Sequence, residues 1–339
     1  MTHAMPKLAV CLLVLPLAAC GRDDPLNPPP ATREEVQALV DRTLSELVFV
    51  QGGTFWMGDY VHGMYPGNGD NEQWWSTNDD NKVQHQVELD GFHIQKHEVT
   101  YAEYDAYTRA TGKPLLYKQY RHMPNTKPNH PANATWYQAR AYCQWLGEQT
   151  GLPFDLPTEA QWEYAARSRG KWVGVASDDG YPDFGRNLPN FERWGHDVCR
   201  FPPNPLGLCD MTANAAEWVY DWYAPDYYQR SPRKNPRGPE SGTLKVRRGG
   251  SFRDSKTLGW SVYRRDAYQP EKSLYVIGFR CVVNRDTPLP QAHIPPSDAE
   301  IEKRIARGKL PPLYPPGSNN LYPDENTRCA SCPEPQSKD

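Results

Sequence analysis

The stretch HPANATWYQARAYCQWLGEQTGLPFDLPTEAQWEYAAR, residues 130–167, decides the fold because it predicts two capped helices close together in the chain. Thr135 is the expected N-cap of the first helix, since its side chain can accept a bond from an otherwise unpaired backbone N–H. Thr158 and Gln161 have the spacing of a capping box and begin the second helix, directly after Pro157. Apolar residues recur at helical spacing behind both caps: Trp136, Ala139, Cys143 and Leu146 in the first helix, and Trp162, Ala165 and Ala166 in the second.

Sequence on either side of this stretch alternates short strands with loops rich in Gly and Pro. A further capping box, Thr100 with Glu103, begins a helix that Gly112 ends. Residues 47–50 form an expected strand, and residues 33–47 carry apolar residues at helical spacing. With 11 Trp and 20 Tyr, the chain is expected to pack its core with aromatic side chains. The predicted fold class is therefore α+β with much irregular structure.

The first residues predict export and a lipid anchor. Lys7 precedes an apolar run, residues 8–19, that is too short for a membrane-spanning helix of about 20 residues and fits a secretory signal. The tetrapeptide LAAC at 17–20 has the pattern of a lipobox, in which Cys20 receives the lipid and anchors the chain to a membrane. The alternative is an ordinary signal peptide with a chance cysteine. Because Gly21, not aspartate, follows the cysteine, we expect the outer membrane, with the domain facing the periplasm or exposed at the surface.

The chain divides into four expected regions. They are a lipoprotein signal peptide at 1–19, a tether with a short helix at 20–46, a folded domain at 47–284 and a proline-rich tail at 285–339, in which 298–307 form a short charged helix. The formal net charge is -3 and basic residues are not clustered, so nucleic acid is not an expected partner.

Of the 8 cysteines, one leaves with the signal and Cys20 carries the lipid. The other cysteines would lie in an oxidising compartment, where disulfides are the usual state of cysteine pairs. Cys199 and Cys209 are close enough in sequence to close a small loop. Cys329 and Cys332 form a C-x-x-C pair, for which a local disulfide is favoured over a redox or metal motif, since one pair cannot supply four zinc ligands.

Several segments form an ordered series of motifs. They are GGTFWMGD (52–59), FHIQKHEVTYAEYDAYTRATGKP (92–114), the stretch 130–167, FPPNPLGLCDMTANAAEW (201–218), RRGGSF (247–252) and GFRCV (278–282). The series resembles the formylglycine-generating-enzyme family of sulfatase-modifying factors over about 47–284, and it is far more specific than any single motif. The resemblance implies a variant of the C-type-lectin-like fold. It also implies a disulfide between Cys143 and Cys281, the alternative being two buried thiols.

The chemistry of that family depends on two cysteines that hold Cu(I), a soft ion that prefers thiolates. In the family both follow the G-G-S segment. The corresponding residues 249–268, GGSFRDSKTLGWSVYRRDAY, contain no cysteine, and Arg253, Asp254 and Ser255 stand where the thiols would be. Copper is therefore not an expected cofactor, and copper-dependent formation of formylglycine is not an expected activity.

Calcium is the cofactor that the resemblance implies, bound by hard oxygen donors, namely carbonyls and one glutamate. The matching positions are Thr212, Ala213, Ala215 and Glu217. Ala213 replaces the glycine that is usual in the family. A second family site matches Asn190 and Phe191, but its later ligands fall where this chain is shorter, around Asp197. The acidic loop 67–81 is a further candidate, against the alternative of a solvated loop.

Two functions of different class are compatible with these residues. One is a non-catalytic envelope lipoprotein that binds a protein, a peptide or a glycan through the surface that forms the substrate groove in the enzymes. The other is a periplasmic oxidoreductase acting on a small molecule or peptide, as in the siderophore-maturing branch of the family. The groove candidates are Trp218, Ser251, Arg253, Asp254 and Arg265, with Arg264 and Asp266 beside them.

A purely structural role is the alternative to a functional one for these residues. Clustered Arg and Asp side chains are also typical of a structural ion-pair network. His85, His93 and His97 share a strand-like run, which fits half-exposed strand residues better than metal ligands. The missing thiols favour the binding function over the oxidoreductase.

Overall fold

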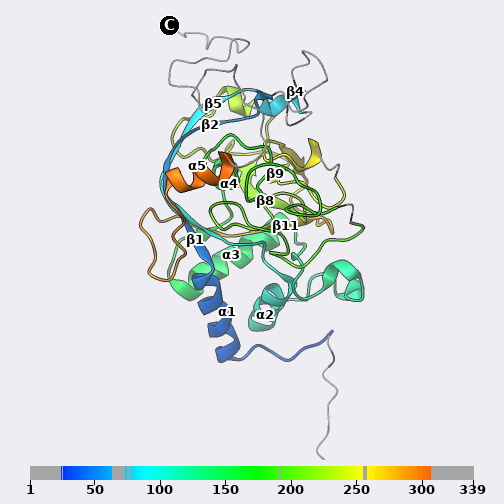
Figure 1. Cartoon of the computed structure of the whole chain (residues 1–339). Helices are drawn as coiled ribbons and strands as arrows, with labels where there is room; N and C mark the ends of the chain where they lie inside the picture. The colour runs from blue at the N-terminus through cyan, green and yellow to red at the C-terminus, as the bar shows by residue number, and fades with distance from the viewer. Residues whose placement is uncertain are drawn as a thin grey trace, which may run out of the picture.

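The computed structural model describes residues 24, 26–62, 73–74, 76, 78–190, 192–254 and 258–306 (Figure 1). The signal peptide, Cys20, Phe191, Ser255, Cys329, Cys332 and most of the acidic loop lie outside these residues. The α-helices of the described part are α1 (Arg33–Ser45), α2 (Tyr101–Thr111), α3 (Trp136–Thr150), α4 (Glu159–Ala166) and α5 (Asp298–Ala306). Its strands are β1 (Leu47–Val50), β2 (Gly53–Met57), β3 (Val61–His62), β4 (Gln73–Trp74), β5 (His85–Leu89), β6 (Phe92–Gln95), β7 (Phe154–Asp155), β8 (Ala216–Trp222), β9 (Lys245–Arg248), β10 (Asp266–Tyr268), β11 (Ile277–Phe279) and β12 (Val282–Val283). Within the described ranges, no helix is both long enough and apolar enough to cross a membrane.

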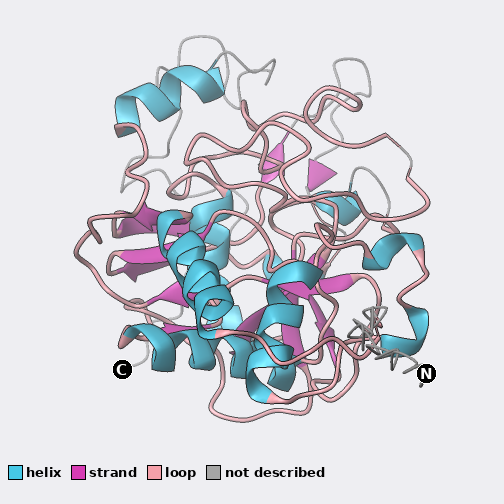
Figure 2. Cartoon of the chain, turned by 90° about the horizontal axis from the view of Figure 1, so that it is seen from below, coloured by secondary structure: helices cyan, strands magenta, loops and turns pink. Residues whose placement is uncertain are grey.

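Two four-stranded sheets form the framework. One has the strand order β1-β6-β12-β7 and the other β10-β9-β8-β11, while β2 pairs with β5 and β3 with β4. Strands β8 and β11 run parallel, with Trp218 opposite Phe279, and the other pairs are antiparallel. Since β11 and β12 follow one another but belong to different sheets, residues 277–283 join the sheets. Helices α1 to α3 gather at one end of the molecule, the β2–β5 ribbon lies at the other, and long loops connect them (Figures 1 and 2). The α+β prediction is confirmed.

Side-chain caps set where the helices begin. Each of four N-cap threonines accepts a hydrogen bond on its side chain from the backbone N–H three residues later. The Glu or Gln side chain at that later position accepts in turn from the backbone N–H of the threonine, which completes a capping box. The four threonines are Thr32, Thr100, Thr135 and Thr158. Gly112 ends α2 with φ 67°, a left-handed conformation that favours glycine. The three helix starts predicted inside the domain are confirmed. The helix expected over 33–47 ends earlier, at Ser45, and Leu47 belongs to β1.

The packed body extends beyond 47–284 at both ends. Leu39 and Val40 of α1 are buried in the same apolar cluster as the inner faces of α2 and α3. At the other end of the chain, Ile301 and Ile305 of α5 are buried in the main core. The described parts of the tether and tail regions therefore belong to the same packed structure.

Aromatic rings fill the space between α2, α3 and the second sheet. Tyr104 and Tyr142 stack at 5.6 Å, and Tyr107 meets Tyr142 edge-on at 5.3 Å. Phe279 of β11 completes the group, with its ring centroid 5.7 Å from that of Tyr142. Such pairs contribute about 0.5–1.5 kcal/mol each beyond the area they bury. The core is aromatic, as the composition predicts.

Two disulfides link segments of the described chain. Cys143 of α3 bonds Cys281, which lies between β11 and β12, and closes a sequence separation of 138 residues. Cys199 bonds Cys209 across a separation of 10 residues. Both predicted pairings are confirmed.

Helix α4 is buried on all sides although it carries two glutamates. Glu159 accepts from Arg248 and Arg265, each at 2.7 Å, and Glu163 accepts from Arg248 at 2.6 Å and Arg167 at 2.8 Å. Burial pushes the pKa of Glu159 upward, but the two arginines outweigh burial and lower it. Buried charges persist only when they are paired in this way, so the ion pairs specify where α4 sits.

Candidate functional site

The candidate groove is built on a turn that directly follows β9. Gly249 and Gly250 have φ of 89° and 67°. A Cβ at Gly249 would lie 3.0 Å from the Met211 carbonyl oxygen, and one at Gly250 would clash with Gly259. Only glycine fits this left-handed pair, which turns the chain out of the sheet. Of the residues 251–254 that follow, Arg253 is exposed, whereas Ser251 and Phe252 are buried. We call these residues the 251–254 turn.

Hydrogen bonds hold the 251–254 turn in one conformation. The backbone N–H and the hydroxyl of Ser251 both donate to Asp254 Oδ2, at 2.8 and 2.7 Å, and Trp260 Nε1 donates to the Ser251 carbonyl at 2.7 Å. Burial would raise the pKa of Asp254, but the Ser251 hydroxyl and Arg264 outweigh burial and lower it. Asp254 is therefore ionised at neutral pH and cannot act as a general acid there.

A chain of alternating charges continues from the turn to the edge strand β10. Arg264 donates to Asp254 at 2.9 Å and to Asp266 at 3.1 Å, and Asp266 also accepts from Arg247 at 2.6 Å. Arg253 is exposed, with its guanidinium 5.8 Å from the centre of the Tyr275 ring. The arrangement offers a cationic and aromatic contact surface next to a rigid ion-pair network.

Three of the five groove candidates do not lie on this surface. Ser251 is buried, with 1% of its surface exposed. Trp218 is fully buried and donates from Nε1 to the Ala134 carbonyl at 2.9 Å. Arg265 is also fully buried and is held by Glu159 and Asp80. The expectation that all three line the groove is corrected. Of the adjacent arginines, Arg264 reaches the surface network, whereas Arg265 pairs inward with Glu159.

The described part of the 251–254 turn and its surroundings offers oxygen and nitrogen groups, not thiols. Every cysteine in the described ranges is bonded in a disulfide, between Cys143 and Cys281 or between Cys199 and Cys209. Soft ions such as Cu(I) prefer thiolates. The residues described here therefore do not fit a copper(I) centre.

The four positions that match the family's calcium site lie at the start of β8. The hydroxyl of Thr212 already accepts a hydrogen bond from the Ala176 N–H, at 2.9 Å. Ala213 has φ 72°, so the alanine adopts the left-handed conformation that glycine has more readily. Glu217 accepts three bonds, from Arg280 Nε and Nη2 and from Trp162 Nε1. A carboxylate has about four acceptor positions, so one remains on Glu217 for a cation.

The residues that match the family's second calcium site do not form a cluster in the described part of the chain. Asn190 is exposed, and Phe191 lies outside the described chain. Asp197 instead faces His130, with Oδ1 and Nε2 3.3 Å apart. Burial lowers the pKa of His130 to about 4, so the imidazole is neutral at pH 7.

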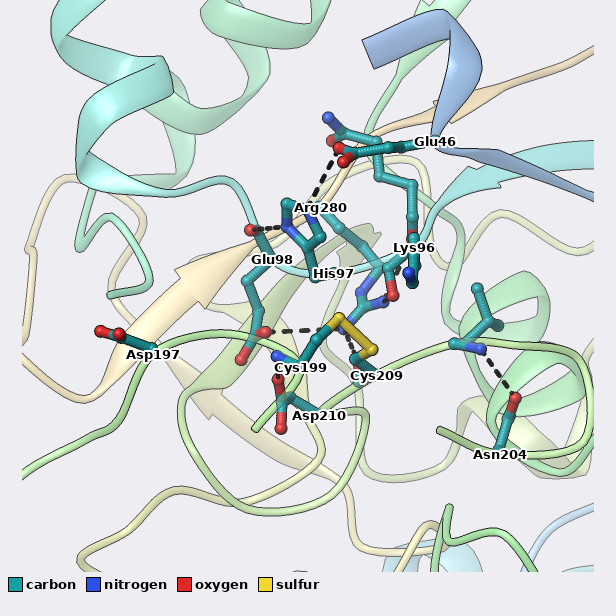
Figure 3. The surroundings of a disulfide bond; sticks show 12 residues. Glu46, Lys96, His97, Glu98, Asp197, Cys199, Asn204, Cys209, Asp210 and Arg280 are labelled. Atoms are coloured by element: carbon teal, nitrogen blue, oxygen red, sulfur yellow. Dashed lines mark hydrogen bonds and ion pairs between the residues drawn. A yellow bond between two sulfur atoms is a disulfide. The ribbon is translucent and has the colours of Figure 1, made fainter. Parts of the chain in front are cut away.

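Sequence reasoning missed a buried acidic group beside the Cys199–Cys209 disulfide (Figure 3). Glu98 is fully buried, and within the described chain neither of its carboxyl oxygens has a hydrogen-bond partner. Burial raises its pKa well above the usual range, as do Asp210 and Glu217, so the protonated form is favoured. Arg280 approaches Glu98 at 3.9 Å while pairing with Glu217. The E-V-T motif alone could have drawn attention to Glu98, but only the fold brings the three acids to one arginine.

The three histidines of the strand-like run do not converge. His93 Nε2 accepts from the Leu289 N–H at 3.0 Å, and His85 Nδ1 faces the Val83 carbonyl. His97 instead faces Glu46, the C-cap of α1, at 3.2 Å. A shared histidine site is thereby excluded.

A separate pocket of about 550 Å³ opens near the end of α3. Its polar lining includes Asp90, Arg237, Arg285 and Asp286. This volume lies within the range of about 300–1,000 Å³ that is typical of small-molecule sites. None of the groove candidates lines it, so this pocket and the surface expected from the resemblance are different places.

The sheets, the Cys143–Cys281 disulfide and the glycine turn after β9 together define a sulfatase-modifying-factor type of fold. The chain belongs to the family described as the sulfatase-modifying factor enzyme 1-like domain, whose model matches residues 32–285.

Relatives of different kinds share this domain. A formylglycine-generating enzyme of Streptomyces coelicolor is 29% identical over 316 residues, covering 76% of this chain and 95% of that protein. The serine/threonine-protein kinase pkn1 of Chlamydia pneumoniae is 31% identical, covering 71% of this chain but only 38% of the kinase. Among solved structures, PvdO from Pseudomonas aeruginosa has the same fold, with a TM-score of 0.56 and 24% identity, covering 70% of this chain and 94% of PvdO.

Proposed function

We propose that this chain is a lipid-anchored envelope protein that uses its domain to bind a partner through the 251–254 turn. The observation that carries the proposal is a pre-formed ion-pair network beside an exposed arginine. Arg264 pairs with both Asp254 and Asp266, and Arg253 is left exposed. A rigid surface of this kind costs little ordering entropy on binding.

The family context is compatible with a binding role. The domain matches a part of a protein named as a kinase as well as proteins named as formylglycine-generating enzymes. A shared fold does not fix a shared activity, because function depends on the residues of the site. Cys20 would supply the membrane anchor, and the proline-rich residues that follow would hold the domain away from the outer membrane.

Calcium is proposed as a structural ion at the start of β8. The carbonyls of Thr212, Ala213 and Ala215 would supply neutral oxygens, and Glu217 would share its carboxylate between the ion and Arg280.

The test of the binding role is a charge reversal at the exposed arginine. Detergent-solubilised full-length protein would be used to capture partners from an envelope extract, alongside Arg253→Glu and Arg230→Glu. Arg230 is the control, because it is also exposed and pairs with Asp226, not with a residue of the turn. We expect a partner that the wild type and Arg230→Glu retain and that Arg253→Glu loses. A partner retained equally by all three forms would place the binding surface elsewhere.

A second candidate, an oxidoreductase or binding protein for a small polar molecule, is favoured by the 550 Å³ pocket alone. Its two arginines, Arg237 and Arg285, would contact an anionic group. Binding of such a molecule that Arg285→Ala abolishes and Arg253→Glu leaves unchanged would support this candidate over the first.

A further inference from the structure

A group of three possible metal ligands lies where α1, the β6–α2 connection and α2 meet. Glu46, His97 and Glu103 each place one ligand atom within 4.8 Å of the others. The three residues come from separate segments, so the group is formed by the fold. Figure 3 shows Glu46 and His97 facing each other beside Lys96 and Glu98.

Hydrogen bonding orients His97 as a ligand. Nδ1 lies 2.8 Å from the Glu98 carbonyl oxygen, an acceptor only, so Nδ1 must carry a proton and donate it. In the neutral imidazole the lone pair is then on Nε2, which faces Glu46. A backbone carbonyl holding the far nitrogen is the usual support of a metal-bound histidine.

The facing atoms are both acceptors when His97 is neutral. His97 Nε2 and Glu46 Oε2 lie 3.2 Å apart, so a proton or another cation must lie between them. In a tetrahedral zinc site with bonds of about 2.0–2.1 Å, neighbouring ligand atoms are about 3.3 Å apart. The observed separation therefore suits two ligands of one metal ion as well as it suits an ion pair.

Glu103 completes the group without giving up its role in the helix cap. Its Oε2 accepts from the Thr100 N–H and hydroxyl, at 2.7 and 2.8 Å. In the described chain, no hydrogen bond is formed to its other oxygen, Oε1, which is left for a cation.

We propose that Glu46, His97 and Glu103 bind a divalent transition-metal ion, for which zinc is the best match. One imidazole and two carboxylates are nitrogen and oxygen donors that suit zinc, and two negative charges balance its charge. The side chain of Glu46 is 34% exposed and that of His97 is 12% exposed, so an ion can enter from solvent and retain water as a fourth ligand. The bound ion joins the end of α1 to the start of α2.

The variants that test the site are chosen to remove a metal ligand while keeping the surrounding hydrogen bonds. In His97→Asn the side-chain amide nitrogen takes the place of Nδ1 and keeps the bond to the Glu98 carbonyl, while the ligand at Nε2 is removed. Glu46→Gln keeps the shape and removes the charge at a partly exposed position. His122→Asn is the matched control, because His122 is exposed and outside the group. All forms carry Cys329→Ser and Cys332→Ser, so that the C-terminal thiols bind no zinc.

Metal-free full-length protein is then titrated with Zn²⁺ and, separately, with Co²⁺ as a spectroscopic probe. We expect one zinc per chain, a higher melting temperature, slower hydrogen exchange in α1, and visible cobalt absorption typical of four or five ligands. His97→Asn and Glu46→Gln should weaken zinc binding by at least about 100-fold, more than an outer-shell change does, and His122→Asn should not. Absence of zinc and cobalt binding in the wild type, or full affinity in both His97→Asn and Glu46→Gln, would overturn the proposal.

Discussion

Arg280 donates from Nε to Glu217 Oε2 at 2.8 Å and from Nη2 to Glu217 Oε1 at 2.7 Å, and neither side chain contacts solvent. Trp162 Nε1 adds a third bond to the same carboxylate at 2.9 Å. The contact joins β8, α4 and the segment after β11, which come from three separate motifs of the sequence. It shows why the final G-F-R-C segment matters to the fold: its arginine neutralises a glutamate that could not be buried alone.

Removing the charge of Glu217 should strongly destabilise the fold. In Glu217→Gln the buried Arg280 loses its partner, and we expect the free energy of unfolding to fall by about 3–5 kcal/mol, as for other broken buried pairs. Denaturant unfolding measures the change, with the exposed Glu240→Gln as the control. A loss below about 1 kcal/mol, the range of surface pairs, would mean that the pair is not buried as described.

Calcium should stabilise the protein if the ion binds at the start of β8. A ligand that binds only the folded state at 100 times its dissociation constant adds about 2.7 kcal/mol. We therefore expect calcium to raise the melting temperature and a chelator to reverse the effect. Unchanged melting in millimolar calcium would mean that Arg280 alone satisfies Glu217.

The two disulfides should differ in their contribution to stability. The Cys143–Cys281 bond spans 138 residues and the Cys199–Cys209 bond 10. Chain entropy alone predicts losses of about 5 and about 3 kcal/mol when each pair is replaced by alanines. Denaturant unfolding of the two double variants provides the comparison. Equal losses, or a larger loss for the short loop, would contradict the entropic account.

Lipidation is expected at Cys20, which lies outside the described residues. Cys20→Ala should release the protein from membranes, because the acyl chains supply the hydrophobic anchor. Detergent phase partitioning and labelling with a fatty-acid analogue measure the loss, with Cys11→Ala as the control. Membrane association that survives in Cys20→Ala would refute the lipoprotein proposal.

Copper-dependent aldehyde formation should be absent. Residues 249–268 present arginine, aspartate, serine, lysine and threonine, which are hard donors or cations, and contain no cysteine. Mass spectrometry of a C-x-P-x-R peptide incubated with protein, copper and oxygen is expected to show unchanged cysteine. The Streptomyces coelicolor relative serves as the positive control. Appearance of the aldehyde would require thiols from another part of the chain, and Cys329→Ser would identify them.

Local signals predicted the helix starts but not the location of the charged residues. Thr100, Thr135 and Thr158 act within three residues of their own positions, so a short window of sequence contains the whole interaction. Arg264 and Arg265 are neighbours in the sequence, yet one reaches the surface network and the other is buried against Glu159. Their different environments depend on the position of α4, whose Glu159 pairs with Arg265, and no local pattern contains that position.

What the sequence alone determined is the family, the fold class, the helix caps and the two disulfides, because each depends on local spacing or on an ordered series of motifs. The tertiary structure alone decided which polar groups meet. Glu46, His97 and Glu103 lie in three segments, and Arg280 and the three acids around it lie in four. Such groups form only when the apolar core fixes the distance between distant segments. Burial then sets their pKa values, and neither distance nor burial is contained in the order of the residues.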